Sequence, residues 1–130
     1  IGGSIAAECK VANTTTEQAA SLDLSNASAQ SAATISVWCN TGQNSADTTY
    51  SSANNGYLVN ESGNQIAYNI NVGDNASALS LSSPQTVQQA SGTGVQGGVQ
   101  SSNVAIIPQV SGFENSGSYS DTIAVTVSYN

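Results

Sequence analysis

The chain has 130 residues, one basic side chain and eight acidic residues, which give a formal net charge of −7. This length predicts a single domain over residues 1–130 with room for an apolar core. The absence of histidine excludes a Ser-His-Asp or Cys-His catalytic pair and an imidazole metal site. With Lys10 as the only basic side chain, the sequence offers no basic surface for nucleic acid.

The remaining polar chemistry gives no sign of an active site. The carboxylates are dispersed along the chain and show no paired spacing of the kind that glycoside hydrolysis requires. No run of about 18 apolar residues exists, so no membrane-inserted segment is expected. The sequence therefore predicts a non-enzymatic protein without a cofactor.

Cys9 and Cys39 are the two cysteines of the chain. An even number of cysteines in a small domain rich in Ser, Thr and Asn favours an oxidising compartment and one disulfide. Two buried free thiols are the alternative interpretation. The chain begins at Ile1 without Met, as a mature secreted protein would.

The first half of the chain alternates apolar and polar residues with the period of a β-strand. A first strand is expected to place Ile5, Ala7, Cys9 and Val11 on one face. A short strand follows at 21–24, and another at 34–40 turns Ile35, Val37 and Cys39 inward and Trp38 outward. Residues 40–56 are predicted to form a polar loop that ends in the turn Asn54-Asn55-Gly56.

The second half continues in the same way. Residues 57–60 and 65–72 form a predicted hairpin across the turn 61–64, and a short strand at 79–81 follows the turn 73–75. Residues 88–100, rich in Gln and Gly, are expected to form a loop or a weak strand with bulges. A strand at 104–110 contains Pro108, which favours a sheet edge or a bulge. Together these elements predict an all-β sandwich of about seven strands.

The C-terminal segment has the clearest alternation and extends to the end of the sequence. Gly117 is the fourteenth residue counted back from Asn130, alternating apolar residues follow it, and Tyr129 is penultimate. This pattern, together with the cysteine pair and the segments 63–69 and 117–127, resembles the spore coat protein U branch of chaperone–usher pilus subunits, which includes the archaic pilins. The resemblance extends from Cys9 to Asn130.

The resemblance implies an immunoglobulin-like sandwich that lacks its last strand and is completed by a donor strand from a partner. A periplasmic chaperone would fill the open groove first, and an outer-membrane usher would then direct assembly. In the fibre, the N-terminal extension of a neighbouring pilin subunit would replace the chaperone, giving a head-to-tail polymer. The residues expected to pair with these strands are Gly117, Tyr119, Ile123, Val125, Val127, Tyr129 and Asn130, whose carboxylate would anchor in a basic site of the chaperone.

The resemblance thus implies an extracellular pilus subunit, located at the cell surface after passage through the periplasm and serving adhesion and biofilm formation. These pilins carry a donor extension of ten or more residues, whereas eight residues precede Cys9 here, and Ile1, Gly2 and Gly3 make a poor donor strand. Either a longer extension precedes Ile1 or the subunit is complemented differently.

A binding module is the alternative function. An autonomous secreted sandwich could recognise sugar or an abiotic surface through Trp38, Tyr50, Tyr57 and the Asn-rich loops.

Overall fold

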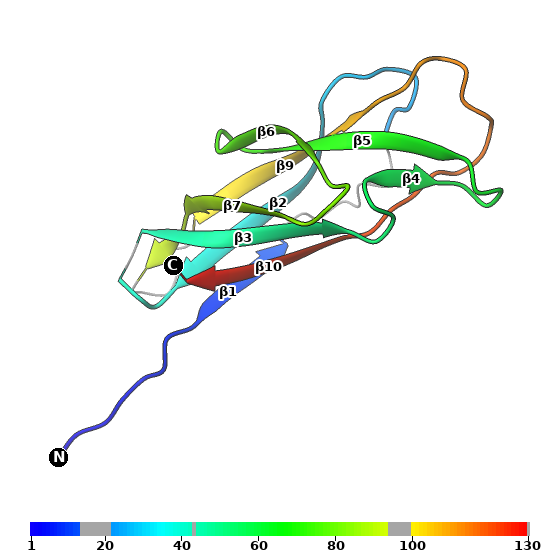
Figure 1. Cartoon of the computed structure of the whole chain (residues 1–130). Helices are drawn as coiled ribbons and strands as arrows, with labels where there is room; N and C mark the ends of the chain where they lie inside the picture. Colours follow the sequence, from blue (N-terminus) through cyan, green and yellow to red (C-terminus); the bar gives the residue numbers. More distant parts are fainter. Residues whose placement is uncertain (14–21, 43, 94–99, 130) are drawn as a thin grey trace.

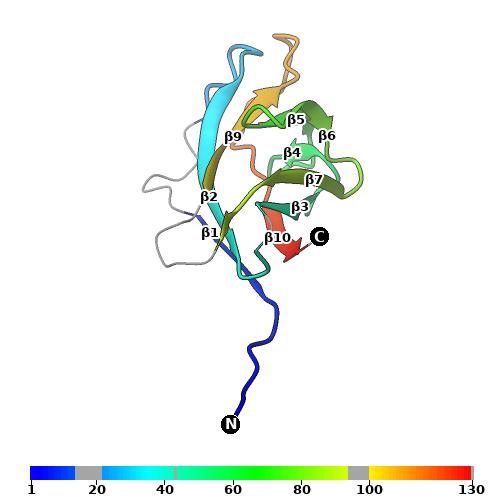
Figure 2. The same ribbon diagram turned by 90° about the vertical axis from the view of Figure 1, so that its left-hand side faces the viewer.

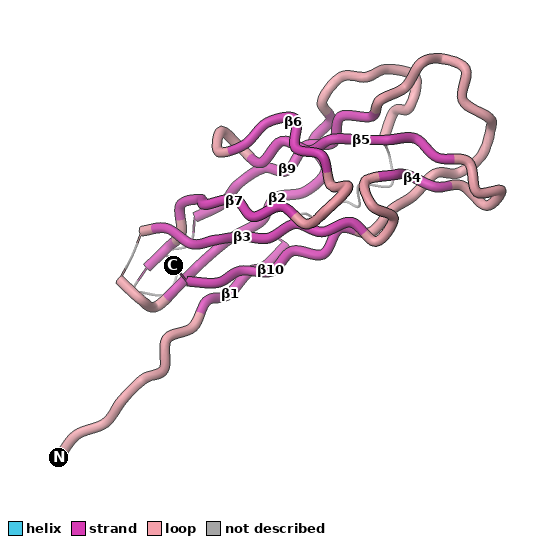
Figure 3. Tube along the Cα trace, in the orientation of Figure 1, coloured by secondary structure: helices cyan, strands magenta, loops and turns pink. Residues whose placement is uncertain are grey.

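The computed structural model describes residues 1–13, 22–42, 44–93 and 100–129, and its regular structure is β-strand (Figures 1 and 3). The strands are β1 (Cys9–Asn13), β2 (Gln30–Cys39), β3 (Ser45–Ser52), β4 (Tyr57–Val59), β5 (Gln65–Val72), β6 (Ala76–Ser80), β7 (Gln85–Ala90), β8 (Gly92–Thr93), β9 (Gln100–Pro108) and β10 (Ile123–Tyr129). Within the described ranges, no helix has the length and apolar character needed to span a bilayer.

The strands form two sheets that pack face to face (Figure 2). The larger sheet has the order β1-β2-β9-β5-β4, with β6 paired to β5 and β8 paired to β2. The smaller sheet has the order β10-β3-β7. Neighbouring strands are antiparallel except for the short β2–β8 pair. The predicted all-β, immunoglobulin-like sandwich is therefore confirmed.

The core lies between the sheets and is built from alternate residues of each strand. In β5 the four inward residues Ile66, Tyr68, Ile70 and Val72 are all buried, as the period-2 pattern predicts. Ile35, Val37 and Cys39 of β2 are buried too. The hairpin β4–β5 and its turn also agree with the sequence interpretation.

The expectation of a polar loop over residues 40–56 is wrong, because Ser45–Ser52 is strand β3 at the centre of the smaller sheet. Its inward residues Ala46, Thr48 and Tyr50 are buried. The small Ala46 and the hydroxyl of Thr48 hide the alternation in the sequence. The Tyr50 hydroxyl donates a hydrogen bond to Oε1 of the buried Gln89 at 3.0 Å, which lets a phenol sit in the core.

Two expectations for residues 88–110 also need correction. Part of the expected Gln/Gly-rich loop belongs to the regular strand β7, whose residues Val87 and Gln89 point inward and are buried. Gly92–Thr93 is the short strand β8, Gln100 begins β9, and residues 94–99 lie outside the described residues. Pro108 is on neither a sheet edge nor a bulge: it is the last residue of β9, a strand between β2 and β5. On the β2 side it lies beyond the last paired residue, Ile106, and on the β5 side Gln109 N–H still donates to the Ala67 carbonyl at 2.8 Å, so its missing N–H interrupts neither ladder.

The start of the chain differs as well. Ile5 and Ala7 are exposed and do not belong to a core strand, because β1 begins at Cys9. Residues 1–8, called the tail below, project from the sandwich (Figures 1 and 2). Leu22 and Leu24 contact the core as predicted, but no strand forms there.

Candidate functional site

Strands β1 and β10 form two neighbouring open edges of the sandwich. Among the described residues, β1 pairs only with β2, and β10 pairs only with β3. The two strands belong to different sheets and lie side by side (Figure 1). Each therefore presents one row of main-chain N–H and C=O groups that the sheets do not use, which is the hydrogen-bonding pattern that a further strand would satisfy.

The inward face of β10 is only half covered. Ile123, Val125 and Val127 point toward the core but are partly buried, and Tyr129 is 52% exposed. The inward apolar and aromatic residues of β5, by contrast, are buried. The sandwich thus contains an apolar strand whose face lacks part of its packing partner.

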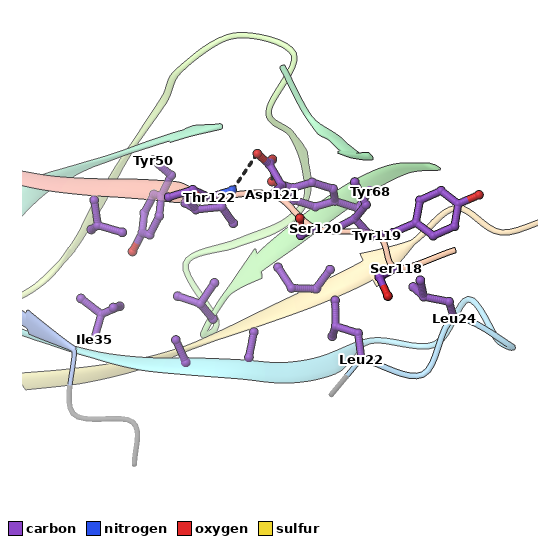
Figure 4. A pocket seen from close by; sticks show the side chains of 17 residues that line it. Leu22, Leu24, Ile35, Tyr50, Tyr68, Ser118, Tyr119, Ser120, Asp121 and Thr122 are labelled. Atoms are coloured by element: carbon purple, nitrogen blue, oxygen red, sulfur yellow. Dashed lines mark hydrogen bonds between the residues drawn. The ribbon is translucent and has the colours of Figure 1, made fainter. Parts of the chain in front are cut away.

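A cavity of about 670 Å³ lies against this face (Figure 4). The cavity is partly open to solvent and is lined by residues that contact the core, so the core is incomplete on this side of the sandwich. Its walls come from both sheets, from the segment before β2 and from the segment before β10, namely Leu22, Leu24, Ala32, Ala33, Ile35, Tyr50, Leu58, Tyr68, Val104, Ile106, Ser118, Tyr119, Ser120, Asp121, Thr122, Ile123 and Val125.

The cavity occupies the part of the sandwich that β1 does not cover. Strand β1 pairs with β2 from Ile35 to Cys39, whereas the cavity borders β2 from Ala32 to Ile35. On the opposite sheet it borders the first half of β10, up to Val125. We use the term groove for the cavity together with the edges of β1 and β10.

Asp121 fixes the segment that leads into β10. Its carboxylate accepts hydrogen bonds from the hydroxyls of Ser52 and Tyr68 and from the backbone N–H of Asn54 at 3.1 Å. Burial, reinforced by the hydrogen bond to Asp121, raises the pKa of Tyr68 well above its usual range. The phenol therefore stays protonated and donates to Asp121 at neutral pH.

Main-chain bonds add to this attachment. Ser120 and Val59 exchange two backbone hydrogen bonds at 2.9 and 3.0 Å, and Ala53 N–H donates to the Thr122 carbonyl at 2.9 Å. The rim of the cavity is thus held to β4 and to the β3–β4 turn, and is preformed.

Gly117 has a local structural role at the start of this segment. Its φ of 147° lies in a region that side chains rarely adopt, and an added Cβ would be 2.8 Å from Nδ2 of Asn60. Asn60 is buried, and its Nδ2 donates to the Ser116 carbonyl at 3.3 Å and to Oδ1 of Asn64 at 3.1 Å. Glycine is therefore required here for the close approach of two loops.

The predicted disulfide between Cys9 and Cys39 is present. The two residues face each other directly across β1 and β2 and are 30 positions apart in the sequence. Closing a loop of this size stabilises the fold by about 3–4 kcal/mol in the chain-entropy model. The bridge also ties the five-residue β1 to the larger sheet, so it holds one side of the groove in place.

The predicted strand-pairing residues occupy different parts of the groove. Tyr119, Ile123 and Val125 line the cavity, while Val127 and Tyr129 continue along β10 toward its end. Gly117 lies just before the rim, and Asn130 is outside the described residues.

The sequence reasoning did not assign the opposite wall, which includes Ala32, Ala33, Tyr50 and Tyr68, to this site. Of these four residues only Tyr68 stood in a predicted apolar alternation, and that pattern marks a core residue and a cavity wall alike.

The aromatic residues of the alternative binding module do not form a common surface. Tyr50 is buried, which contradicts its proposed exposure. Trp38 is partly buried on β2, with Nζ of Lys10 5.4 Å from its ring centroid, and Tyr57 is on β4. Strands β9 and β5 separate β2 from β4 in the sheet. Across the described ranges, no three His, Cys, Asp or Glu side chains are grouped as metal ligands.

Comparisons with known proteins agree with this geometry. Among solved structures, the chain resembles the crystal structure of the CsuC–CsuE chaperone–tip adhesion subunit pre-assembly complex from archaic chaperone–usher Csu pili of Acinetobacter baumannii. The TM-score is 0.55 at 15% identity, and the match covers 96% of this chain and 40% of that chain. The chain thus spans less than half the length of that match, and the likeness concerns the fold. No curated protein matches the sequence.

The family comparison covers most of the sequence. The model of the Spore Coat Protein U domain matches residues 2–126, a range that includes both cysteines, the cavity walls and most of β10. The chain therefore belongs to the spore coat protein U domain family.

Proposed function

We propose that this chain is a structural subunit of an extracellular chaperone–usher pilus that polymerises by accepting a donor strand in the groove. The observation that carries the proposal is the 670 Å³ cavity beside the half-covered face of β10. A strand added there would bond to open main-chain edges and place every second side chain in the cavity. Family membership and the fold of the Csu complex support the same function.

The positions of the tail and the cavity favour a linear polymer. The tail leaves the sandwich where β1 begins, at the end where β10 terminates (Figure 1). The cavity lies beside the first half of β10, toward the opposite end. A contact between the tail of one copy and the cavity of the next is heterologous, so repetition gives an open filament.

The unfilled groove explains the need for a chaperone. An apolar face and two open edges favour aggregation of the free subunit, so a periplasmic chaperone would donate a strand until the usher passes the subunit to the fibre. The carboxylate of Asn130 would anchor in a basic site of that chaperone. The disulfide fits this oxidising route. At the cell surface, the pilus would serve adhesion and biofilm formation without catalysis.

The proposal can be tested with two aspartate variants of adjacent residues. Val125 lines the cavity, whereas Thr126 is exposed on the outer face of β10. Val125→Asp should abolish filament formation, because a charge in the groove has no partner, and Thr126→Asp should leave filaments intact. Electron microscopy of filaments grown from the purified proteins measures this. Filaments of Val125→Asp equal to those of the unmodified chain would contradict the proposal.

A further inference from the structure

The tail carries two of the large apolar side chains that the fold leaves exposed. Ile5 is 90% exposed and Ile1 is fully exposed. In an extended chain, residues 1, 3, 5 and 7 share one face, so Ile1 and Ile5 would point the same way with Gly3 between them. No side chain from Ile1 to Ala7 is charged. This face has the character of a short apolar strand.

Asn40 fixes the direction in which the tail leaves. Its side-chain oxygen accepts a hydrogen bond from Glu8 N–H at 2.8 Å, and its backbone N–H donates to the Glu8 carbonyl at 3.0 Å. Its Nδ2 also donates to the Ala6 carbonyl at 2.9 Å. The tail is thus attached at its base and projects away from the sandwich (Figures 1 and 2).

The cavity is widened on the β2 side by two consecutive alanines. The β2–β9 register shifts between Ser31 and Ala33, which makes Ala32 an extra residue in β2. Both Ala32 and Ala33 therefore border the cavity, although consecutive strand residues normally point to opposite faces. Further along β2, Ile35 and Val37 fill the core with larger side chains.

We propose that Ile5 of one copy is the anchor residue of the donor strand and occupies the space over Ala32 and Ala33 of the next copy. This assignment rests on the proposed function and adds the identity of the donor and its register. In an end-to-end pair, the tail enters the groove of the next copy from the cavity end. In the bound state, the tail residues nearest to their own β1 therefore lie beside the cavity. Ile5 is the large apolar residue in that part of the tail.

The charge on the cavity wall is compatible with this occupant. Among the described residues of that wall, Asp121 is the one with a carboxylate, and it already accepts hydrogen bonds from Ser52 and Tyr68. An uncharged aliphatic side chain leaves these bonds in place, whereas an acidic one would be repelled.

The register can be tested by making the residue at position 5 of the tail smaller and the residue at position 33 of the receptor larger. The full chain serves as receptor, and a labelled synthetic peptide of residues 1–8 serves as probe. Replacing Ile5 by Ala in the peptide should weaken binding at least tenfold, and Ala33→Leu in the receptor should weaken binding of the unmodified peptide as much. The Ala33→Leu receptor should bind the Ile5→Ala peptide within a few-fold of the original pair. Ala124→Leu, an exposed position on β10, is the matched control and should change nothing.

The possible failures are distinguishable. Equal affinity of the unmodified and Ile5→Ala peptides would overturn the assignment of Ile5. If the tail peptide fails to bind while a peptide of alternating Val and Thr binds, the tail is not the donor, and strand capture still stands. If neither peptide binds, strand capture itself is contradicted, and the proposed function fails with it.

Discussion

Strands β5 and β10 have nearly the same sequence pattern and very different surroundings. Each alternates β-branched and aromatic residues with small or polar ones. The inward side chains of β5 are buried, and β5 has neighbours on both edges. Within the part of the chain that the structure describes, β10 pairs with β3 alone, and its inward face borders a cavity. Alternation thus shows which face a strand turns inward, and the neighbouring strands decide whether that face is covered.

The largest expected difference concerns truncation of one inward residue in each strand. Ile70→Ala should lower the free energy of unfolding by about 2–5 kcal/mol, because it empties a filled site in the core. Val125→Ala should lower it by about 1 kcal/mol or less, because Val125 already borders a void. Urea denaturation of the two variants measures both values. Equal losses would show that β10 is as well packed as β5.

The disulfide tests how far one edge of the groove depends on covalent attachment. Replacing both cysteines by serine should lower the free energy of unfolding by about 3–4 kcal/mol. It should also reduce binding of a donor peptide, because β1 loses its bridge to β2. Denaturation and peptide titration of the same variant measure the two effects. Unchanged peptide affinity would show that β1 is not part of the groove.

Gly117 allows a comparison of two glycines with positive φ. Gly117→Ala should cost about 2–3 kcal/mol, since it combines an unfavourable backbone conformation with a clash against Asn60. Gly63 has a φ of 84° with nothing within 4 Å of an added Cβ, so Gly63→Ala should cost only about 1 kcal/mol. Thermal unfolding of both variants measures the difference, which contains the Asn60 contact and the different φ of the two glycines. Equal stability losses in the two variants would show that the contact with Asn60 contributes nothing.

The two buried tyrosines predict sensitivity to alkali. Burial raises the pKa of Tyr50 to about 12 and raises that of Tyr68 further, while both ionise near pH 10 in the unfolded chain. Their contribution to stability is therefore complete below pH 10 and is lost as the pH rises through the folded-state values. The urea midpoint should fall above pH 10, and less steeply in Tyr68→Phe. A urea midpoint that stays constant up to pH 12 would contradict the raised pKa values of the two tyrosines.

The smallest effect is expected far from the groove. Ala78 has a φ of 53°, which costs an alanine about 1–2 kcal/mol relative to glycine. Ala78→Gly should raise the free energy of unfolding by about 0.5–1 kcal/mol after the entropy loss of glycine is included. Urea denaturation measures it, and a loss of stability would show that the strain is relieved elsewhere.

The sequence predicts the strands whose inward residues are strongly apolar, such as β2, β5 and β10, and it also predicts the disulfide. It fails for β3, because Ala46 and Thr48 do not look like core residues until β7 and β10 are placed on either side. It also misplaces Ile5, since alternation cannot distinguish a core strand from a projecting tail.

The candidate site, like the fold, could be predicted from the sequence only in part. The β10 side could be inferred from a continuous local pattern. The opposite wall could not, because a bulge at Ala32 and the packing of two sheets bring its residues together, and neither leaves a local signal in the sequence.

Amide hydrogen exchange of β10 tests the central claim most directly. The N–H groups of Ile123–Tyr129 that face away from β3 have no sheet partner among the described residues, so they should exchange rapidly in the free chain. When filaments form or a donor peptide is added, the same amides should become strongly protected, while those of β5 remain protected throughout. Filaments in which the outward amides of β10 still exchange as fast as in the free chain would contradict strand addition at this edge.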